Sequence, residues 1–178
     1  MKNDILKVLI SKEELEAKVK ELGQMITRDY KDKDLMIVGI LKGCVIFLSD
    51  LIREIDLPLT MDFMVVSSYG SSTKSSGVVR IIKDLEKDIA GKDVLIVEDI
   101  VDTGLTLNYL VDYLKSRNAN SVKICTLLEK PDRRKVEVDL EYVGFHIPDE
   151  FVVGYGLDYA EVYRNLPFVC ILKPEVYS

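Results

Sequence analysis

Four consecutive apolar residues at positions 94–97 (VLIV) run directly into two adjacent carboxylates, Glu98 and Asp99. A short, continuous apolar run is typical of a strand that is covered on both faces, as in a parallel sheet. We expect this strand to stop at the acid pair. In an open α/β sheet, ligands bind beyond the carboxyl ends of the strands. The segment therefore predicts a ligand site built around two carboxylates.

The rest of the chain alternates between strand and helix patterns. Helices are predicted over residues 11–30, 45–55 and from Thr103 or Thr106 to about 117, and strands over residues 35–41, 59–66, 78–83, 94–97, 122–128, 140–145, 151–153 and 168–172. Ser11 and Glu14 have the spacing of a capping box at the first helix. The alternation indicates an α/β fold, with a mostly parallel sheet flanked by helices on both faces. No repeat or linker divides the 178 residues, so we expect one domain.

Charge and composition exclude several classes of function. The formal net charge of −6 argues against binding to nucleic acid, which depends on a basic surface. No apolar run approaches the ~20 residues that cross a bilayer, and the first residues lack the apolar core of a signal peptide. We therefore expect a cytoplasmic protein with no membrane partner. Three scattered cysteines and a single histidine argue against a zinc site and suit a reducing compartment.

The residues that follow the acid pair have the chemistry of a phosphate-binding loop. Gly104 allows the backbone to approach a ligand closely, and hydroxyl side chains with free amides at a helix start suit a phosphate. Three acids beside a phosphate would repel it unless they act on other groups. Glu98 and Asp99 are therefore expected to hold ribose hydroxyls or Mg²⁺, and Asp102 to act as a base on the other reactant.

Residues 94–106 (VLIVEDIVDTGLT) resemble the phosphoribosyl-pyrophosphate signature of the type I phosphoribosyltransferases. The similarity extends over nearly the whole chain and, in its order of motifs, matches the hypoxanthine-guanine phosphoribosyltransferases. It implies the type I fold, with a core at about residues 33–130 and a small hood from about residues 1–10 and 131–178. It also implies a purine-salvage enzyme that uses Mg²⁺. Such an enzyme transfers 5-phosphoribosyl from phosphoribosyl pyrophosphate to N9 of hypoxanthine or guanine, giving IMP or GMP. A homodimer or homotetramer is expected on the same ground.

The resemblance assigns each part of the site to particular residues. The phosphoribosyl group would be bound by Glu98, Asp99, Asp102, Thr103, Gly104, Leu105 and Thr106. Pyrophosphate would be bound by Lys42, Gly43 and Arg164, the purine by Lys130, Phe151, Val152 and Asp158, and the metal by Glu98, Asp99 and Asp158. Ser68 and Tyr69, in the Ser-rich loop 67–77, would form a lid. Leu105 stands where certain relatives carry lysine and would offer only its backbone amide.

The resemblance also gives each residue around the purine a specific role. Asp102 would act as the catalytic base that takes a proton from N7 of the purine. Lys130 would donate to O6, which explains a preference for 6-oxopurines over adenine. Phe151 would stack on the ring, and Val152 would offer its backbone to the pyrimidine edge.

Other interpretations of the same residues are weaker. A two-component receiver domain also has an acid pair after its first strand, but here more than ninety residues precede the pair. Aspartic proteases share the tripeptide Asp102-Thr103-Gly104, but they are rich in β-structure. A nucleotide-binding regulator on the phosphoribosyltransferase fold remains the main alternative. The acidic balance, together with Asp102, Lys130 and Arg164, favours an enzyme. Taken alone, Arg164 would pair with Glu161 on a local turn.

Overall fold

The computed structural model describes residues 1–68 and 79–178, and the structural statements below refer to these residues. In chain order the elements are η1 (Lys2–Asp4), β1 (Ile5–Ile10), α1 (Lys12–Asp29), β2 (Leu35–Leu41), α2 (Val45–Arg53), β3 (Thr60–Ser68), β4 (Val79–Lys83), β5 (Asp93–Val101), α3 (Leu105–Ser116), β6 (Ser121–Glu129), η2 (Pro131–Arg133), β7 (Tyr142–His146), β8 (Val152–Val153), β9 (Val169–Leu172) and α4 (Pro174–Tyr177). Within the described part of the chain, no helix combines the length and the apolar character needed to span a membrane.

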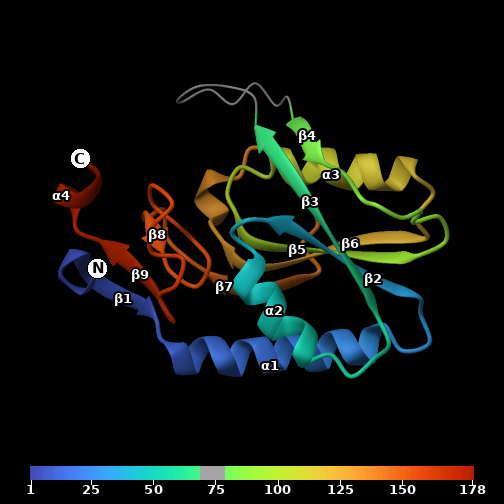
Figure 1. The fold of residues 1–178 in the computed structure, drawn as a ribbon, viewed down its shortest axis with the longest axis horizontal. Coiled ribbons are helices and arrows are strands. Elements are labelled where there is room, and N and C mark those ends of the chain that lie inside the picture. Colours follow the sequence, from blue (N-terminus) through green and yellow to red (C-terminus); the bar gives the residue numbers. More distant parts are fainter. Residues whose placement is uncertain (69–78) are drawn as a thin grey trace.

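A six-stranded sheet forms the centre of the molecule, in the order β4-β3-β2-β5-β6-β7 (Figure 1). Strands β3, β2, β5, β6 and β7 run parallel to one another, and only β4 is antiparallel to its neighbour. The central position of β2 and β5 explains why residues 35–41 and 94–97 are continuously apolar, since both faces are covered. The predicted α/β fold with a mostly parallel sheet is confirmed.

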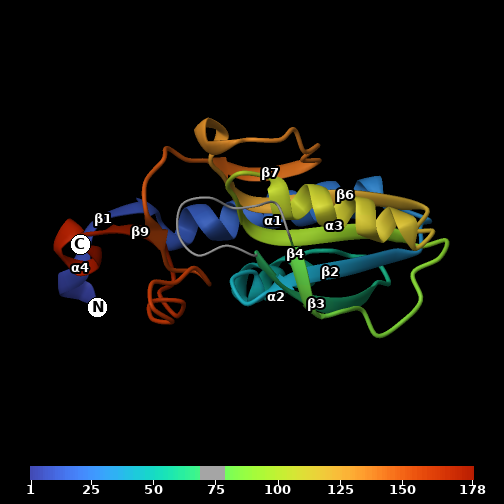
Figure 2. The ribbon, with the colours of Figure 1, turned by 90° about the horizontal axis from the view of Figure 1, so that it is seen from above.

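Helices cover both faces of this sheet. Helices α1 and α2 lie on one face and α3 on the other (Figures 1 and 2). Neighbouring strand residues point to opposite faces. Accordingly, Leu95 packs in the core with α1 and α2, whereas Ile96 packs in the core with α3. Each fully buried side chain of this kind contributes about 1.5–3 kcal/mol relative to exposure. The predicted capping box is present, because Glu14 N donates to Ser11 Oγ at 3.1 Å and Ser11 N donates to Glu14 Oε2 at 2.7 Å.

A second, three-stranded sheet joins the two ends of the chain, in the order β1-β9-β8 (Figures 1 and 2). Its strands are antiparallel, and β1 was not predicted because three of its six residues are exposed. We expected residues 131–178 to lie wholly outside the core. Instead, β7 pairs with β6 in the large sheet, and only the later strands join the small one.

The acid pair lies within a strand and not beyond its end. Strand β5 continues through Glu98 and Asp99 to Val101, because β6 accompanies it up to the pair Val101–Glu129. The prediction that the strand stops at the acids is therefore wrong. Likewise, the first two serines of the expected 67–77 loop belong to β3, and the remainder of that loop, including Tyr69, lies outside the described residues.

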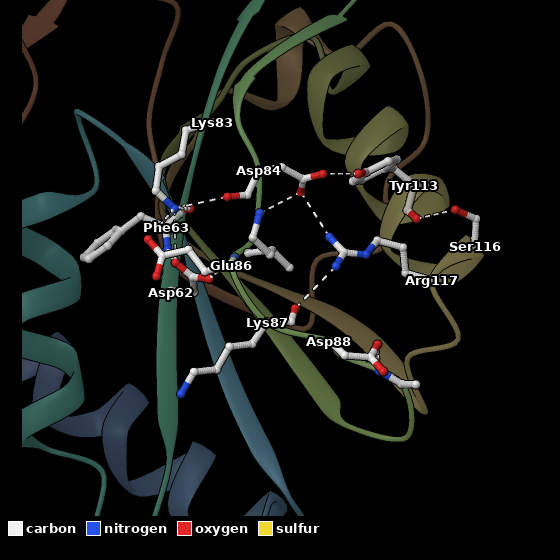
Figure 3. Close-up of polar contacts among 12 residues, drawn as sticks. Asp62, Phe63, Lys83, Asp84, Glu86, Lys87, Asp88, Tyr113, Ser116 and Arg117 are labelled. Carbon is white, nitrogen blue, oxygen red and sulfur yellow. Dashed lines mark hydrogen bonds and ion pairs between the residues drawn. The ribbon is translucent and has the colours of Figure 1, made fainter.

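A polar network ties the edge of the large sheet to α3 (Figure 3). The carboxylate of Asp84, just after β4, accepts hydrogen bonds from the Tyr113 hydroxyl on α3 and from Nη1 of Arg117, the C-cap of that helix. Lys83 Nζ donates to the Phe63 carbonyl oxygen at 2.9 Å and pairs with Asp62 Oδ1 at 3.3 Å. These contacts fix β4, the edge strand that neighbours the undescribed segment, to both β3 and α3.

Candidate active site

A cavity of about 350 Å³ opens at the carboxyl end of the large sheet, where segments far apart in sequence meet. The residues after β2 form one part of its wall, the end of β5 and the start of α3 a second, and residues 158–164 a third. Its lining includes Gly43, Glu98, Asp99, Asp102, Asp158 and Arg164. The predicted phosphoribosyl and pyrophosphate residues are thus largely brought together at one site.

Very close packing joins these segments at two glycines. A Cβ atom built on Gly43 would lie 1.8 Å from Asp99 Oδ2. Gly156 has φ +103°, and a Cβ built on it would lie 2.1 Å from the carbonyl oxygen of Gly43. The peptide bond between Leu41 and Lys42 is cis. The two Cβ contacts require glycine at positions 43 and 156, because any side chain there would displace the loop or the carboxylate.

The two adjacent carboxylates lie in a poorly solvated environment. Burial, followed by the charge of Asp99, raises the pKa of Glu98 well above its ordinary value. Burial also raises the pKa of Asp99, while the Ile100 amide and the Arg164 charge oppose the shift. Both side chains remain partly accessible, since they line the cavity. A cation or hydrogen-bond donor that entered the cavity would stabilise their ionised forms.

The loop after β5 leads into α3 through a left-handed glycine. Gly104 is the N-cap of α3, with φ +83° and ψ −6°, and a Cβ there would lie 3.0 Å from the Val136 carbonyl oxygen. The carbonyl oxygen of Thr103 accepts a hydrogen bond from Lys135 N at 2.9 Å. The loop is thus held from behind by residues 134–138, while the first amides of α3 lie beside the cavity. Free amides at a helix start bind anions well.

Arg164 lines the cavity, and it shares an acid with Lys42, the neighbour of the lining residue Gly43. Lys42 Nζ lies 2.8 Å from Glu161 Oε2, and Arg164 Nη2 lies 3.2 Å from Glu161 Oε1. Arg164 also donates to the Gly156 carbonyl oxygen at 2.7 Å and pairs with Asp158 at 3.0 Å. Within the described residues its buried Nε has no hydrogen-bond partner. The local pairing with Glu161 therefore exists, but Arg164 also lines the cavity.

A second cavity of about 730 Å³ adjoins the first and shares Asp99, Ile100, Asp102 and Asp158 with it. Lys130, Phe151 and Val152, the predicted purine-binding residues, line this second cavity. The side chain of Lys130 is 11% exposed, and its Nζ lies 3.7 Å from Asp149 Oδ1. Phe151 is 39% exposed, which leaves part of its ring open to a ligand.

Several residues at the second cavity were not predicted. Arg133 Nε donates to Asp102 Oδ1 at 2.6 Å, and Arg133 Nη1 lies 3.5 Å from Asp149 Oδ2. Tyr177 and Asp149 also line this cavity. The charged tract from Lys130 to Lys135 has the composition of a loop, with no apolar periodicity. The positive charge three residues after Lys130 is the signal that the sequence offers for Arg133, but the pattern alone does not reveal its partner.

The predicted three-acid metal site is not formed by its side chains alone. No cluster of three or more possible metal-ligating side chains lies within reach of one ion in the described ranges. Asp158 instead pairs with Arg164 and accepts a hydrogen bond from Glu161 N at 2.8 Å. Any ion here would need additional oxygen ligands, from water or from a substrate. Mg²⁺ is often bound in this way, by one or two carboxylates together with substrate phosphates.

Comparisons with known proteins agree with this geometry. The family model for the phosphoribosyl transferase domain matches residues 9–160. The hypoxanthine-guanine phosphoribosyltransferase of Bacillus subtilis is 59% identical over 178 residues, which are 100% of this chain and 99% of that protein. A crystal structure of a hypoxanthine phosphoribosyltransferase from Staphylococcus aureus superposes with a TM-score of 0.98 and 57% identity, covering 100% of this chain and 97% of the other. The bifunctional protein TilS/HprT of Listeria monocytogenes is 58% identical, and the chain spans 28% of its length.

Proposed function

Because the chain belongs to the hypoxanthine-guanine branch of the phosphoribosyltransferase family, we propose that its two joined cavities bind the two substrates of purine salvage. The first cavity takes phosphoribosyl pyrophosphate, and the second takes a 6-oxopurine. The observation that carries this proposal is the shared wall, in which Asp99 and Asp102 border both cavities. A wall of this kind allows C1 of the ribose and N9 of the purine to meet.

The reaction breaks the bond between C1 of the ribose and an oxygen of pyrophosphate, and forms a bond between C1 and N9. Pyrophosphate leaves with the electron pair of the broken bond, and the transition state resembles an oxocarbenium ion, as in other glycosyl transfers. The purine attacks through N9 and loses its N7 proton to the carboxylate of Asp102. Before the purine binds, Arg133 holds this carboxylate at 2.6 Å.

The phosphoribosyl group would be held by the end of β5 and the start of α3. Glu98 and Asp99 would accept hydrogen bonds from the ribose hydroxyls. The backbone amides and hydroxyls of Thr103, Gly104, Leu105 and Thr106 would surround the 5-phosphate. The partial positive charge of a helix start stabilises this anion without a lysine at position 105.

The leaving pyrophosphate needs positive charge and hydrogen-bond donors. Lys42, the Gly43 amide and Arg164 would supply them, with stabilisation that grows as negative charge develops. Lys42 and Arg164 would exchange their shared partner Glu161 for the pyrophosphate oxygens. Magnesium, when bound, would supply further positive charge to these oxygens. The hard carboxylate oxygens of Glu98, Asp99 and Asp158 suit it when substrate oxygens complete the set.

Recognition of the base would depend on the second cavity. Lys130 would donate to O6, which the amino group of adenine cannot replace, because it offers no acceptor. Phe151 would stack on the purine, and the backbone of Val152 would meet the pyrimidine edge. Ser68 and Tyr69 remain our proposal for a lid that excludes water from the cationic transition state.

The whole chain would act as one phosphoribosyltransferase domain, in a homodimer or homotetramer, as the family resemblance implies. Sedimentation velocity would check the assembly. We further propose that it acts in the cytoplasm. The three cysteines are buried and free, which suits a reducing compartment.

The activity is tested by mixing the purified chain with phosphoribosyl pyrophosphate, Mg²⁺ and one purine at a time. Nucleotide is expected from hypoxanthine and guanine, and little from adenine. Formation of AMP at a rate similar to IMP would contradict the role of Lys130. If no purine gives a nucleotide, the chain is better explained as a nucleotide-binding regulator on the same fold.

A further inference from the structure

The ring of Phe151 is held by two tyrosines from different segments. The centroid of Tyr177 lies 5.2 Å from that of Phe151, with 36° between the ring planes. Tyr159 packs edge-on to Phe151 at 5.7 Å and contacts Tyr177 at 6.3 Å. The three rings form an aromatic cluster in which each ring touches the other two.

Tyr177 reaches this position because α4 is anchored to the small sheet. The amide of Lys173, just before α4, donates to the Asp4 carbonyl oxygen at 2.8 Å. Val176 packs against the small-sheet core that contains Val153 and Leu172. Helix α4 therefore has a defined place next to β9, and this fixes the direction in which the Tyr177 ring approaches Phe151.

The same tyrosine also lines the second cavity. Tyr177 borders it together with Asp102, Lys130 and Phe151, and 37% of its surface is exposed. Within the described residues, no hydrogen bond to its hydroxyl is formed. Its ring is the part that contacts Phe151.

We propose that Tyr177 is a positioning residue for the purine. Its ring holds Phe151 at the tilt needed for stacking on the base and closes the cavity on that side. This inference rests on the proposed function, because it assumes that the purine occupies the second cavity. Contacts between aromatic rings depend on geometry and add a modest stabilisation beyond the burial of area. We therefore expect a moderate effect, confined to the purine.

The test compares Tyr177→Leu, which removes the ring, with Tyr177→Phe, which removes only the hydroxyl. The leucine variant should raise KM for hypoxanthine and guanine by about 3- to 10-fold, with KM for phosphoribosyl pyrophosphate and the melting temperature little changed. The phenylalanine variant should behave as wild type. Calorimetric titration with GMP should show a matching loss of affinity in the leucine variant.

Tyr109→Leu is the matched control. Tyr109 is 39% exposed and stacks on another tyrosine, Tyr113, at 6.3 Å, but it lies on α3 and does not line the second cavity. Its KM values should not change. An unchanged purine KM in Tyr177→Leu, or equal losses for both substrates with a lower melting temperature, would overturn the inference. Inactivity of the wild-type chain with every purine would instead overturn the proposed function.

Discussion

The backbone of Gly43 lies directly against the carboxylate of Asp99, so that a Cβ atom on Gly43 would fall 1.8 Å from Asp99 Oδ2. Gly43→Ala must therefore push Asp99 away from the ribose position or displace the loop. A misplacement of about 1 Å in a reacting complex costs roughly 10²-fold in rate. We expect kcat/KM for phosphoribosyl pyrophosphate to fall by about this factor.

Gly91→Ala provides a contrasting control. Gly91 also has a positive φ, +76°, but a Cβ there would meet nothing within 4 Å, and the residue precedes β5 at the end opposite the cavity. This variant should lower the melting temperature through backbone strain and leave kcat/KM unchanged. Wild-type kinetics in Gly43→Ala would show that the contact with Asp99 does not matter for turnover.

Asp102→Asn tests the assigned base. The asparagine keeps the size of the side chain but cannot accept the N7 proton, so turnover should fall by about 10²–10⁴-fold. Single-turnover measurements with saturating substrates would check this. Asp112→Asn, an exposed position on α3, should retain full activity. A near-wild-type rate for Asp102→Asn at pH 7 would remove Asp102 from this role.

Lys130→Ala tests recognition of the 6-oxo group. The side chain of Lys130 is 11% exposed and its ammonium lies 3.7 Å from Asp149 Oδ1, so its removal also leaves that acid without this partner. A lost hydrogen bond from a charged group costs about 1.5–3 kcal/mol, and we expect a purine KM higher by roughly 10- to 100-fold. Binding of phosphoribosyl pyrophosphate should be unaffected.

Lys123→Ala is the control for Lys130, because it removes a partly exposed lysine from β6, the strand that Lys130 directly follows, where it pairs with Glu141. Its kinetic constants should match those of the wild type. Equal losses of affinity for both substrates in Lys130→Ala would contradict an assignment to O6.

Local patterns predicted the large sheet well because its strands are covered on both faces. The boundaries of β2 follow from its apolar run alone. The boundary of β5 does not, because Glu98 and Asp99 are strand residues only by virtue of β6 beside them. Strand β1 was missed for a similar reason. It is largely exposed and forms through pairing with β9, which is distant in sequence.

In the candidate site, too, some features could be predicted from the sequence and others could not. The stretch from Glu98 to Thr106 is contiguous, so its chemistry was readable from its order of residues. The contact of Arg133 with Asp102 depends on how η2 folds back over the loop after β5. The ring of Tyr177 reaches Phe151 only through the pairing that anchors α4. Neither relationship leaves a periodic signal in the sequence.

Asp62 on β3 should make the stability of the fold depend on pH. Burial alone would raise the pKa of this carboxyl. However, hydrogen bonds from the Glu86 and Phe63 amides and from Lys83 outweigh burial and leave the pKa below its ordinary value. A carboxyl with a lower pKa in the folded state stabilises the fold above its unfolded pKa, about 3.9. This stabilisation is lost as pH falls through the folded value.

Asp62→Asn should therefore reduce the free energy of unfolding by about 1–3 kcal/mol at pH 7, with a difference from wild type that shrinks below about pH 4. Urea unfolding at a series of pH values, followed by circular dichroism, would measure it. Asp112→Asn, which is exposed on α3, should show little difference at any pH. Because Asp62 holds Lys83 and the Glu86 amide beside β4 (Figure 3), a constant loss of stability across the whole pH range would mean that the packing of this side chain matters and its charge does not.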